Sequence, residues 1–110
     1  MRQPLVAGNW KMNGSKASAE ALLAGIKEGV ADISKAEILV CPPFPYLAQA
    51  VLGLANSPVA VGAQNACTES GGAYTGEVSA GMIKDIGCIY VIFNDFRVLA
   101  VKRQGGCSVF

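Results

Sequence analysis

The sequence contains no histidine, and its four cysteines form no C-x-x-C pair. These absences exclude a Cys/His zinc site, so we expect no metal and read all four cysteines as reduced thiols. Nine Lys and Arg against eight Asp and Glu leave a net charge of +1, which gives no electrostatic basis for binding nucleic acid.

Long apolar runs are also missing. No run approaches the ~18 residues of a membrane span, and Pro4 interrupts the N-terminus before a signal-peptide core could form. We therefore expect no membrane partner and a cytoplasmic location.

The apolar residues that are present form four short runs, at residues 5–9, 38–41, 59–63 and 89–93. Runs of this length predict buried parallel strands that are covered on both faces. Between the first two runs, residues at three- and four-residue spacing form one helix face: Ala19, Leu22, Leu23, Ile26 and Val30. Strands alternating with helices indicate an α/β fold with right-handed crossovers, although they do not separate a barrel fragment from a doubly wound sheet.

Residues suited to helix ends support this alternation. Ser15 or Ser18 could cap the first helix, Pro45 suits the first turn of a second, and Ser79 could cap a third. Gly87 would close that third helix.

The segment Gly8-Asn9-Trp10-Lys11-Met12-Asn13-Gly14 follows the first apolar run. If the extended conformation continues to Lys11, then Ala7, Asn9 and Lys11 share one face of the strand. An inward lysine is costly unless it meets an anion, so this pattern indicates a site for a negatively charged ligand. The alternative is a surface lysine that flanks a strand.

This segment resembles the N-terminal signature of triosephosphate isomerase. Four later segments follow in that family's order: Val40-Cys41-Pro42-Pro43-Phe44-Pro45-Tyr46-Leu47, Val61-Gly62-Ala63-Gln64-Asn65, Gly72-Ala73-Tyr74-Thr75-Gly76-Glu77-Val78-Ser79 and Ile83-Lys84-Asp85-Ile86-Gly87. The resemblance runs from Leu5 to about Ile92.

The resemblance implies a partial (β/α)8 TIM barrel of about four β/α units with parallel strands. A complete barrel needs about 250 residues, and this chain has 110. We expect residues 1–92 to form the N-terminal part of such a barrel. Residues 93–110 match nothing in the family and form an unrelated tail, either disordered or the product of an altered reading frame.

The family interconverts dihydroxyacetone phosphate and glyceraldehyde 3-phosphate through an enediolate, without a cofactor. By resemblance, Lys11 is the catalytic cation near this phosphorylated triose substrate, and Asn9 and Lys11 bind it. The family's catalytic histidine lies in a Gly-His-Ser-Glu-Arg-Arg motif, and Asp95 stands in its place here. The family's general base lies on a later strand, beyond Phe110. We therefore expect the truncated chain to be inactive alone.

The family is a homodimer in its full-length form, and a long loop of each subunit enters a pocket of the other. The segment Gln64 to Val78 resembles this loop. By resemblance, Thr75 approaches the partner's Asn9, and Met12 lines the receiving pocket. The expected dimer-interface residues are Met12, Gln64, Asn65, Thr75, Gly76 and Glu77.

Two other functions remain open. The chain could be a non-catalytic fragment that associates with a complete isomerase subunit, because four parallel strands leave two edges and the inner face uncovered. It could also be a flavodoxin-like binding module, although no Gly-rich phosphate loop follows the first strand.

Overall fold

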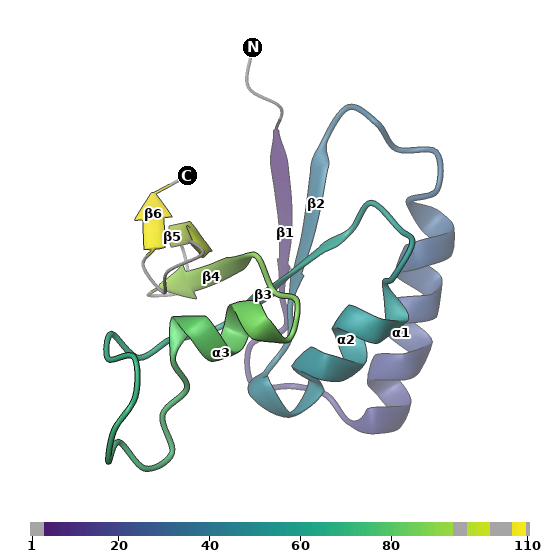
Figure 1. The fold of residues 1–110 in the computed structure, drawn as a ribbon. Coiled ribbons are helices and arrows are strands. Elements are labelled where there is room, and N and C mark those ends of the chain that lie inside the picture. Colours follow the sequence, from purple (N-terminus) through teal and green to yellow (C-terminus); the bar gives the residue numbers. More distant parts are fainter. Residues whose placement is uncertain (1–3, 94–96, 102–106, 110) are drawn as a thin grey trace.

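The computed structural model describes residues 4–93, 97–101 and 107–109. Its strands form one sheet in the order β1-β2-β3-β4-β5-β6, so spatial order follows chain order (Figure 1). Strands β1 to β4 are parallel, and β5 and β6 continue the sheet with antiparallel pairing.

The parallel strands lie close to where the sequence predicts them. They are β1 (Leu5–Asn9), β2 (Glu37–Cys41), β3 (Ala60–Ala63) and β4 (Tyr90–Phe93). The register pairs Ala7 with Leu39 and Gly62 with Tyr90. The predicted α/β fold with four parallel strands is confirmed.

Three α-helices connect these strands: α1 (Lys16–Gly29), α2 (Leu47–Gly53) and α3 (Ala80–Asp85), with a short 3₁₀ helix η1 (Phe44–Tyr46) before α2. Ser15 caps α1 and forms a capping box with Ser18, because each side chain accepts from the other's backbone N–H. Ser79 caps α3 by accepting from the Met82 N–H, as predicted. Gly87 follows α3 with φ +110°, a conformation that favours glycine.

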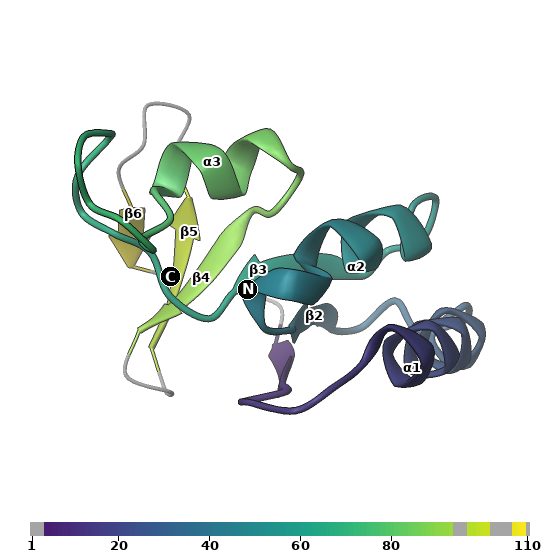
Figure 2. The same cartoon turned by 90° about the horizontal axis from the view of Figure 1, so that it is seen from below.

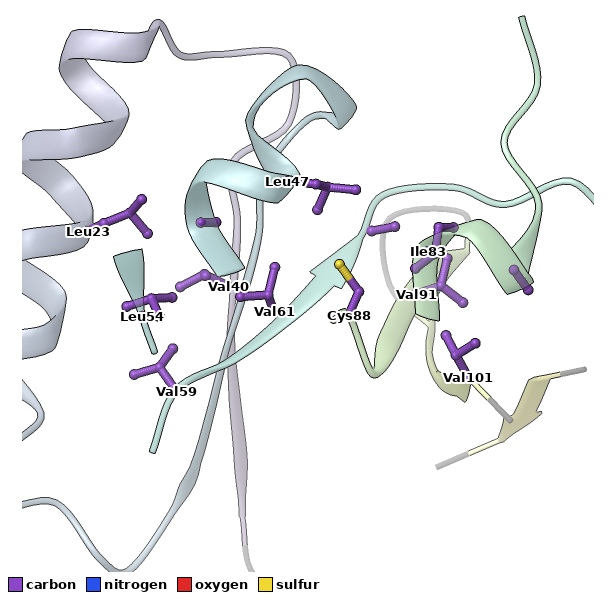
Figure 3. Packing of buried hydrophobic residues seen from close by; sticks show 13 residues of the cluster. Leu23, Val40, Leu47, Leu54, Val59, Val61, Ile83, Cys88, Val91 and Val101 are labelled. Atoms are coloured by element: carbon purple, nitrogen blue, oxygen red, sulfur yellow. The ribbon is translucent and has the colours of Figure 1, made fainter. Parts of the chain in front are cut away.

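The larger core lies between the sheet and the helices, which all cover the same side of the sheet (Figure 2). Val40, Val61 and Val91 of the strands meet Leu23 of α1 and Ile83 of α3 (Figure 3). Ala19 and Leu23 are the buried residues of the predicted α1 face, whereas Leu22 is exposed.

A second apolar cluster lies on the opposite, inner face of the sheet. Leu39, Cys41, Tyr90 and Ile92 form it and are all buried. The prediction that this face stays uncovered is therefore wrong for β2 and β4. Val98 and Ala100 of β5 pack against the cluster and help to cover it.

Strands β5 (Arg97–Val101) and β6 (Cys107–Val109) are not predicted by the sequence pattern. β5 pairs antiparallel with β4, so that Tyr90 faces Ala100 and Ile92 faces Val98. The sheet therefore changes polarity between β4 and β5. Residues 94–96, 102–106 and 110 of the predicted tail lie outside the described residues.

Strand β1 departs from the prediction that all four strands are buried. It lies at an edge of the sheet and pairs only with β2 among the described strands, and Val6 is 57% exposed. Its apolar sequence predicted burial because composition cannot show whether a neighbouring strand is present.

Candidate functional site

The carboxyl ends of β1, β2 and β3 meet at one edge of the sheet, because parallel strands end on the same side. Predicted site residues lie at these ends: Asn9 is the last residue of β1 and Lys11 follows it, and Gln64 and Asn65 follow β3. A backbone hydrogen bond joins the ends of β1 and β2, since the Trp10 N–H donates to the carbonyl of Cys41 at 3.1 Å.

Lys11 does not continue the strand, and this corrects the prediction that it shares a face with Ala7 and Asn9. β1 ends at Asn9, and Lys11 has φ +55°, in the left-handed region that residues with a side chain rarely occupy. The Asn9 side chain accepts a hydrogen bond from the Lys11 N–H at 2.9 Å, which stabilises this turn. Lys11 is exposed, so the penalty for burying an inward ammonium does not arise.

Gln64 holds the Lys11 backbone in place. Its side-chain amide donates to the carbonyl of Lys11 and to the carbonyl of Cys41, both at 2.8 Å. One amide therefore joins the segments after β1, β2 and β3. Strained backbone persists only where its surroundings fix it, and the hydrogen bonds of Asn9 and Gln64 help to fix Lys11.

An open cavity of about 490 Å³ lies beside Lys11 and Gln64. Four predicted site residues line it: Lys11, Met12, Gln64 and Asn65. Pro43, Phe44 and Pro45 form the rest of its wall. Sequence reasoning gave these three no site role, although the Pro-Pro-Phe-Pro segment after a strand end was the available signal.

The other predicted interface residues lie on the loop between β3 and α3, which projects away from the sheet (Figure 1). Its base is closed by the Cys67 N–H, which donates to the Val78 carbonyl at 2.7 Å. Thr75, Gly76 and Glu77 are exposed, and none of them lines the cavity beside Lys11. Within one chain the structure therefore separates these three residues from Lys11 and Met12.

Met12 stands at the cavity rim with 93% of its surface exposed. A single exposed apolar side chain is ordinary at a protein surface and does not by itself mark a binding surface. Its predicted role in receiving a partner's loop stays a prediction.

Two thiols near the sheet are held protonated by burial. Burial raises the pKa of Cys41 to about 12, and the neighbouring Cys88 adds to the shift. Burial alone raises the pKa of Cys88 to about 11. Cys67 is only half-buried. Cys41, Cys67 and Cys88 are free cysteines, as predicted.

In the described ranges, no three His, Cys, Asp or Glu side chains gather where they could hold a metal ion. Across the same residues, no helix has the length and apolar character needed to cross a membrane. Asp95, the residue expected at the position of the family's catalytic histidine, lies outside the described residues.

Three strand–helix units followed by a fourth parallel strand, with polar groups at the carboxyl ends of the strands, define a partial (β/α)8 barrel. The sequence profile described as Triosephosphate isomerase matches residues 4–95. The chain belongs to the triosephosphate isomerase family.

Curated relatives and a solved structure agree. The chain is 58% identical over 92 residues to the triosephosphate isomerase of Cupriavidus necator, which covers 84% of this chain and 36% of that protein. It is 48% identical over 110 residues to that of Actinobacillus pleuropneumoniae serotype 3, covering 99% of this chain and 42% of that protein. The crystal structure of triosephosphate isomerase from Bartonella henselae has a TM-score of 0.75 and 36% identity, over 82% of this chain and 37% of that one.

The chain thus spans between one third and one half of the length of these relatives. The alignment to Cupriavidus necator covers 92 residues, whereas the alignment to Actinobacillus pleuropneumoniae extends over nearly the whole chain.

Proposed function

We propose that residues 4–92 supply one wall of a triose-phosphate isomerase site, and that the 110-residue chain alone does not turn over. In this proposal Lys11 stabilises negative charge on the substrate phosphate and the enediolate, and Asn9 holds Lys11 and the substrate oxygens. The observation that carries the proposal is the Lys11 turn. Its strained backbone is fixed by Asn9 on one side and by Gln64 on the other, at the rim of an open cavity.

The reaction needs three groups: a base at the reacting carbon, donors at the developing oxyanion, and a grip on the phosphate. The present chain offers an ammonium at Lys11 for the second and third tasks. Asp95 does not replace the family's histidine, because a carboxylate of ordinary pKa is anionic at neutral pH and repels an oxyanion. The loss of a general base lowers a rate by about 10²–10⁴, and the loss of an oxyanion donor by about 10²–10³.

A chimera tests the role of Lys11 in a protein that also contains the general base and the oxyanion donor. Residues 4–92 replace the aligned segment of the Cupriavidus necator triosephosphate isomerase, and a coupled assay measures isomerisation of glyceraldehyde 3-phosphate. We expect an active chimera whose kcat/KM falls at least about 100-fold on Lys11→Met. Lys16→Met, an exposed lysine at the start of α1, is the matched control and should have no effect.

An active chimera that tolerates Lys11→Met would refute the assigned role of Lys11. The 110-residue chain itself is assayed in parallel. Turnover near that of the parent enzyme would overturn the second half of the proposal.

A second function is favoured by the exposed loop and by Met12. We propose that the loop residues Thr75, Gly76 and Glu77 can enter the pocket of a complete isomerase subunit, whereas Met12 and Asn65 receive the loop of that subunit. The chain would then act as a non-catalytic partner. Support comes from the separation of the three loop residues from the cavity that Met12 lines.

Size-exclusion chromatography with light scattering tests this association. The Cupriavidus necator enzyme is mixed with the chain, and a species that contains one copy of each is the expected result. Thr75→Arg should abolish it by steric overlap, and Glu20→Arg on the exposed face of α1 is the control. Two unmixed peaks would exclude this function.

A further inference from the structure

The edge of β4 is already occupied by the chain's own β5. In a complete (β/α)8 barrel all eight strands are parallel, so the strand that follows β4 must pair with it in parallel. β5 instead pairs antiparallel along all of β4, from Tyr90 with Ala100 to Phe93 with Arg97. The Val101 N–H also donates to the carbonyl of Ile89 at 2.9 Å, which extends the pairing by a residue before β4.

Both faces of β5 are packed. On the inner face, Val98 and Ala100 contact the cluster that contains Tyr90 and Ile92. On the helix side, Leu99 packs against the larger core and Val101 is buried within it. Alternate residues of one strand thus serve both cores, which is the pattern of an internal strand and not of a loosely attached tail.

We propose that β5 is an in-chain cap that covers the β4 edge of the half-barrel and prevents a parallel barrel strand from joining there. While β5 is docked, the chain cannot be completed into an isomerase barrel through this edge. Among the strands that the structure describes, β1 forms the other edge of the parallel set, at the opposite end of the sheet. Strands β2, β3 and β4 lie between β5 and β1, the strand that precedes Lys11, so the cap is independent of the function proposed for that residue.

Hydrogen–deuterium exchange of the 110-residue chain tests the docking of β5. We expect residues 90–93 and 98–101 to be protected to a degree that does not change with protein concentration. Val101→Asp, which places a charge in the core, should lower the protection of residues 90–93 by about tenfold or more. Val6→Asp is the matched control, because it makes the same change in the exposed edge strand β1.

Protection of residues 37–41 in β2 distinguishes a cap from a strand on which the whole fold depends. We expect it to survive in Val101→Asp. Its loss would overturn the proposal, and so would unchanged protection of residues 90–93.

A mixing experiment tests the consequence for the barrel. The probe is the part of the Cupriavidus necator triosephosphate isomerase that follows its segment aligned with this chain. We expect this polypeptide to co-elute with Val101→Asp and not with the unsubstituted chain. Co-elution with the unsubstituted chain, or with neither, would show that β5 is not what controls access to the edge.

Discussion

The hydroxyl of Tyr90 in β4 donates a hydrogen bond to the carboxylate of Glu37 in β2, across the intervening strand β3. Small residues make this possible, because Ala60 and Gly62 are the β3 residues on the same face. A Cβ at Gly62 would lie 3.2 Å from the Tyr90 Cβ and 3.1 Å from the Cys41 Sγ. The bond therefore fixes the spacing of three strands at the inner face.

Removing this hydroxyl should weaken the sheet. Tyr90→Phe retains the ring and its packing, and it leaves Glu37 without this donor. Hydrogen bonds to charged groups contribute about 1.5–3 kcal/mol, and partial exposure of Glu37 places the expected loss in the free energy of unfolding near the lower end. Urea denaturation followed by circular dichroism measures it. Tyr74→Phe, in the exposed loop, serves as the control.

Alkaline pH should destabilise the fold. Burial, with the hydrogen bond to Glu37 second, raises the pKa of Tyr90 from 10.0 to about 12. Burial raises the pKa of Cys41 from 9.0 to about 12 and the pKa of Cys88 from 9.0 to about 11. Because the folded chain holds these protons more tightly than the unfolded chain, their stabilisation is complete below pH 9 and is lost as pH rises through the folded values.

The measurement is the free energy of unfolding at several pH values between neutrality and about pH 12, the highest of these pKa values. Tyr90→Phe should make the decline above pH 10, the ordinary pKa of tyrosine, shallower. A stability that stays constant over this range would contradict the assignment.

Gly87 should not tolerate a side chain. Its φ of +110° is unfavourable for other residues, and an added Cβ would lie 2.7 Å from Val51 Cγ1. Overpacking of this kind costs about 1–3 kcal/mol, so Gly87→Ala should lower the midpoint of thermal unfolding. Gly25→Ala is the control within α1, where an added Cβ meets nothing within 4 Å. That change should stabilise the chain by up to about 1 kcal/mol.

The cysteines should differ in reactivity. In a Cys107→Ser background, Cys67 should react with a thiol reagent in the folded chain, whereas Cys41 and Cys88 should react only after denaturation. Burial protects the last two and keeps them protonated, and the thiolate is the reactive form. Counting thiols before and after adding denaturant checks this. When Cys67→Ser is added to this background, Cys41 and Cys88 are the cysteines that are left. Rapid modification of this folded double variant would contradict the prediction.

Gln64 should matter to the site through the Lys11 backbone. Gln64→Glu replaces the amide that donates to the carbonyls of Lys11 and Cys41 with a carboxylate, which cannot donate when ionised. In the chimera we expect kcat/KM to fall by about tenfold or more, because misplacing a catalytic group reduces the rate steeply. Gln49→Glu is the control, because the Gln49 amide donates to the carbonyl of Lys16. It shows whether the loss of any side-chain amide donor lowers kcat/KM.

Local signals predicted most of the parallel sheet. Short apolar runs identified β1 to β4, and Ser15 and Ser79 marked the starts of α1 and α3, because caps and strand burial depend on nearby residues. β5 was missed although Val98 to Val101 form a short apolar run like those of β1 to β4, because residues 93–110 were set apart by their lack of resemblance to the family. The short connection between Phe93 and Arg97 is compatible only with antiparallel pairing, because a parallel pair needs a long crossover.

The site shows the same division. Motif resemblance located Lys11, Met12, Gln64 and Asn65, which line one cavity. Extrapolating the strand to Lys11 failed, because Asn9 and Gln64 impose a turn through hydrogen bonds that spacing alone does not encode. The role of Gln64 as an anchor between three strands emerged only from the structure.

The polarity change after β4 also sets an order of events during folding. Phe93 pairs with Arg97 after a short connection, whereas Leu5 must find Glu37 across an entire helix. Chain closure over short separations is faster, so the β4–β5 hairpin should form before the parallel pairs. A nascent chain would thus commit its fourth strand to a local partner before the slower crossovers assemble.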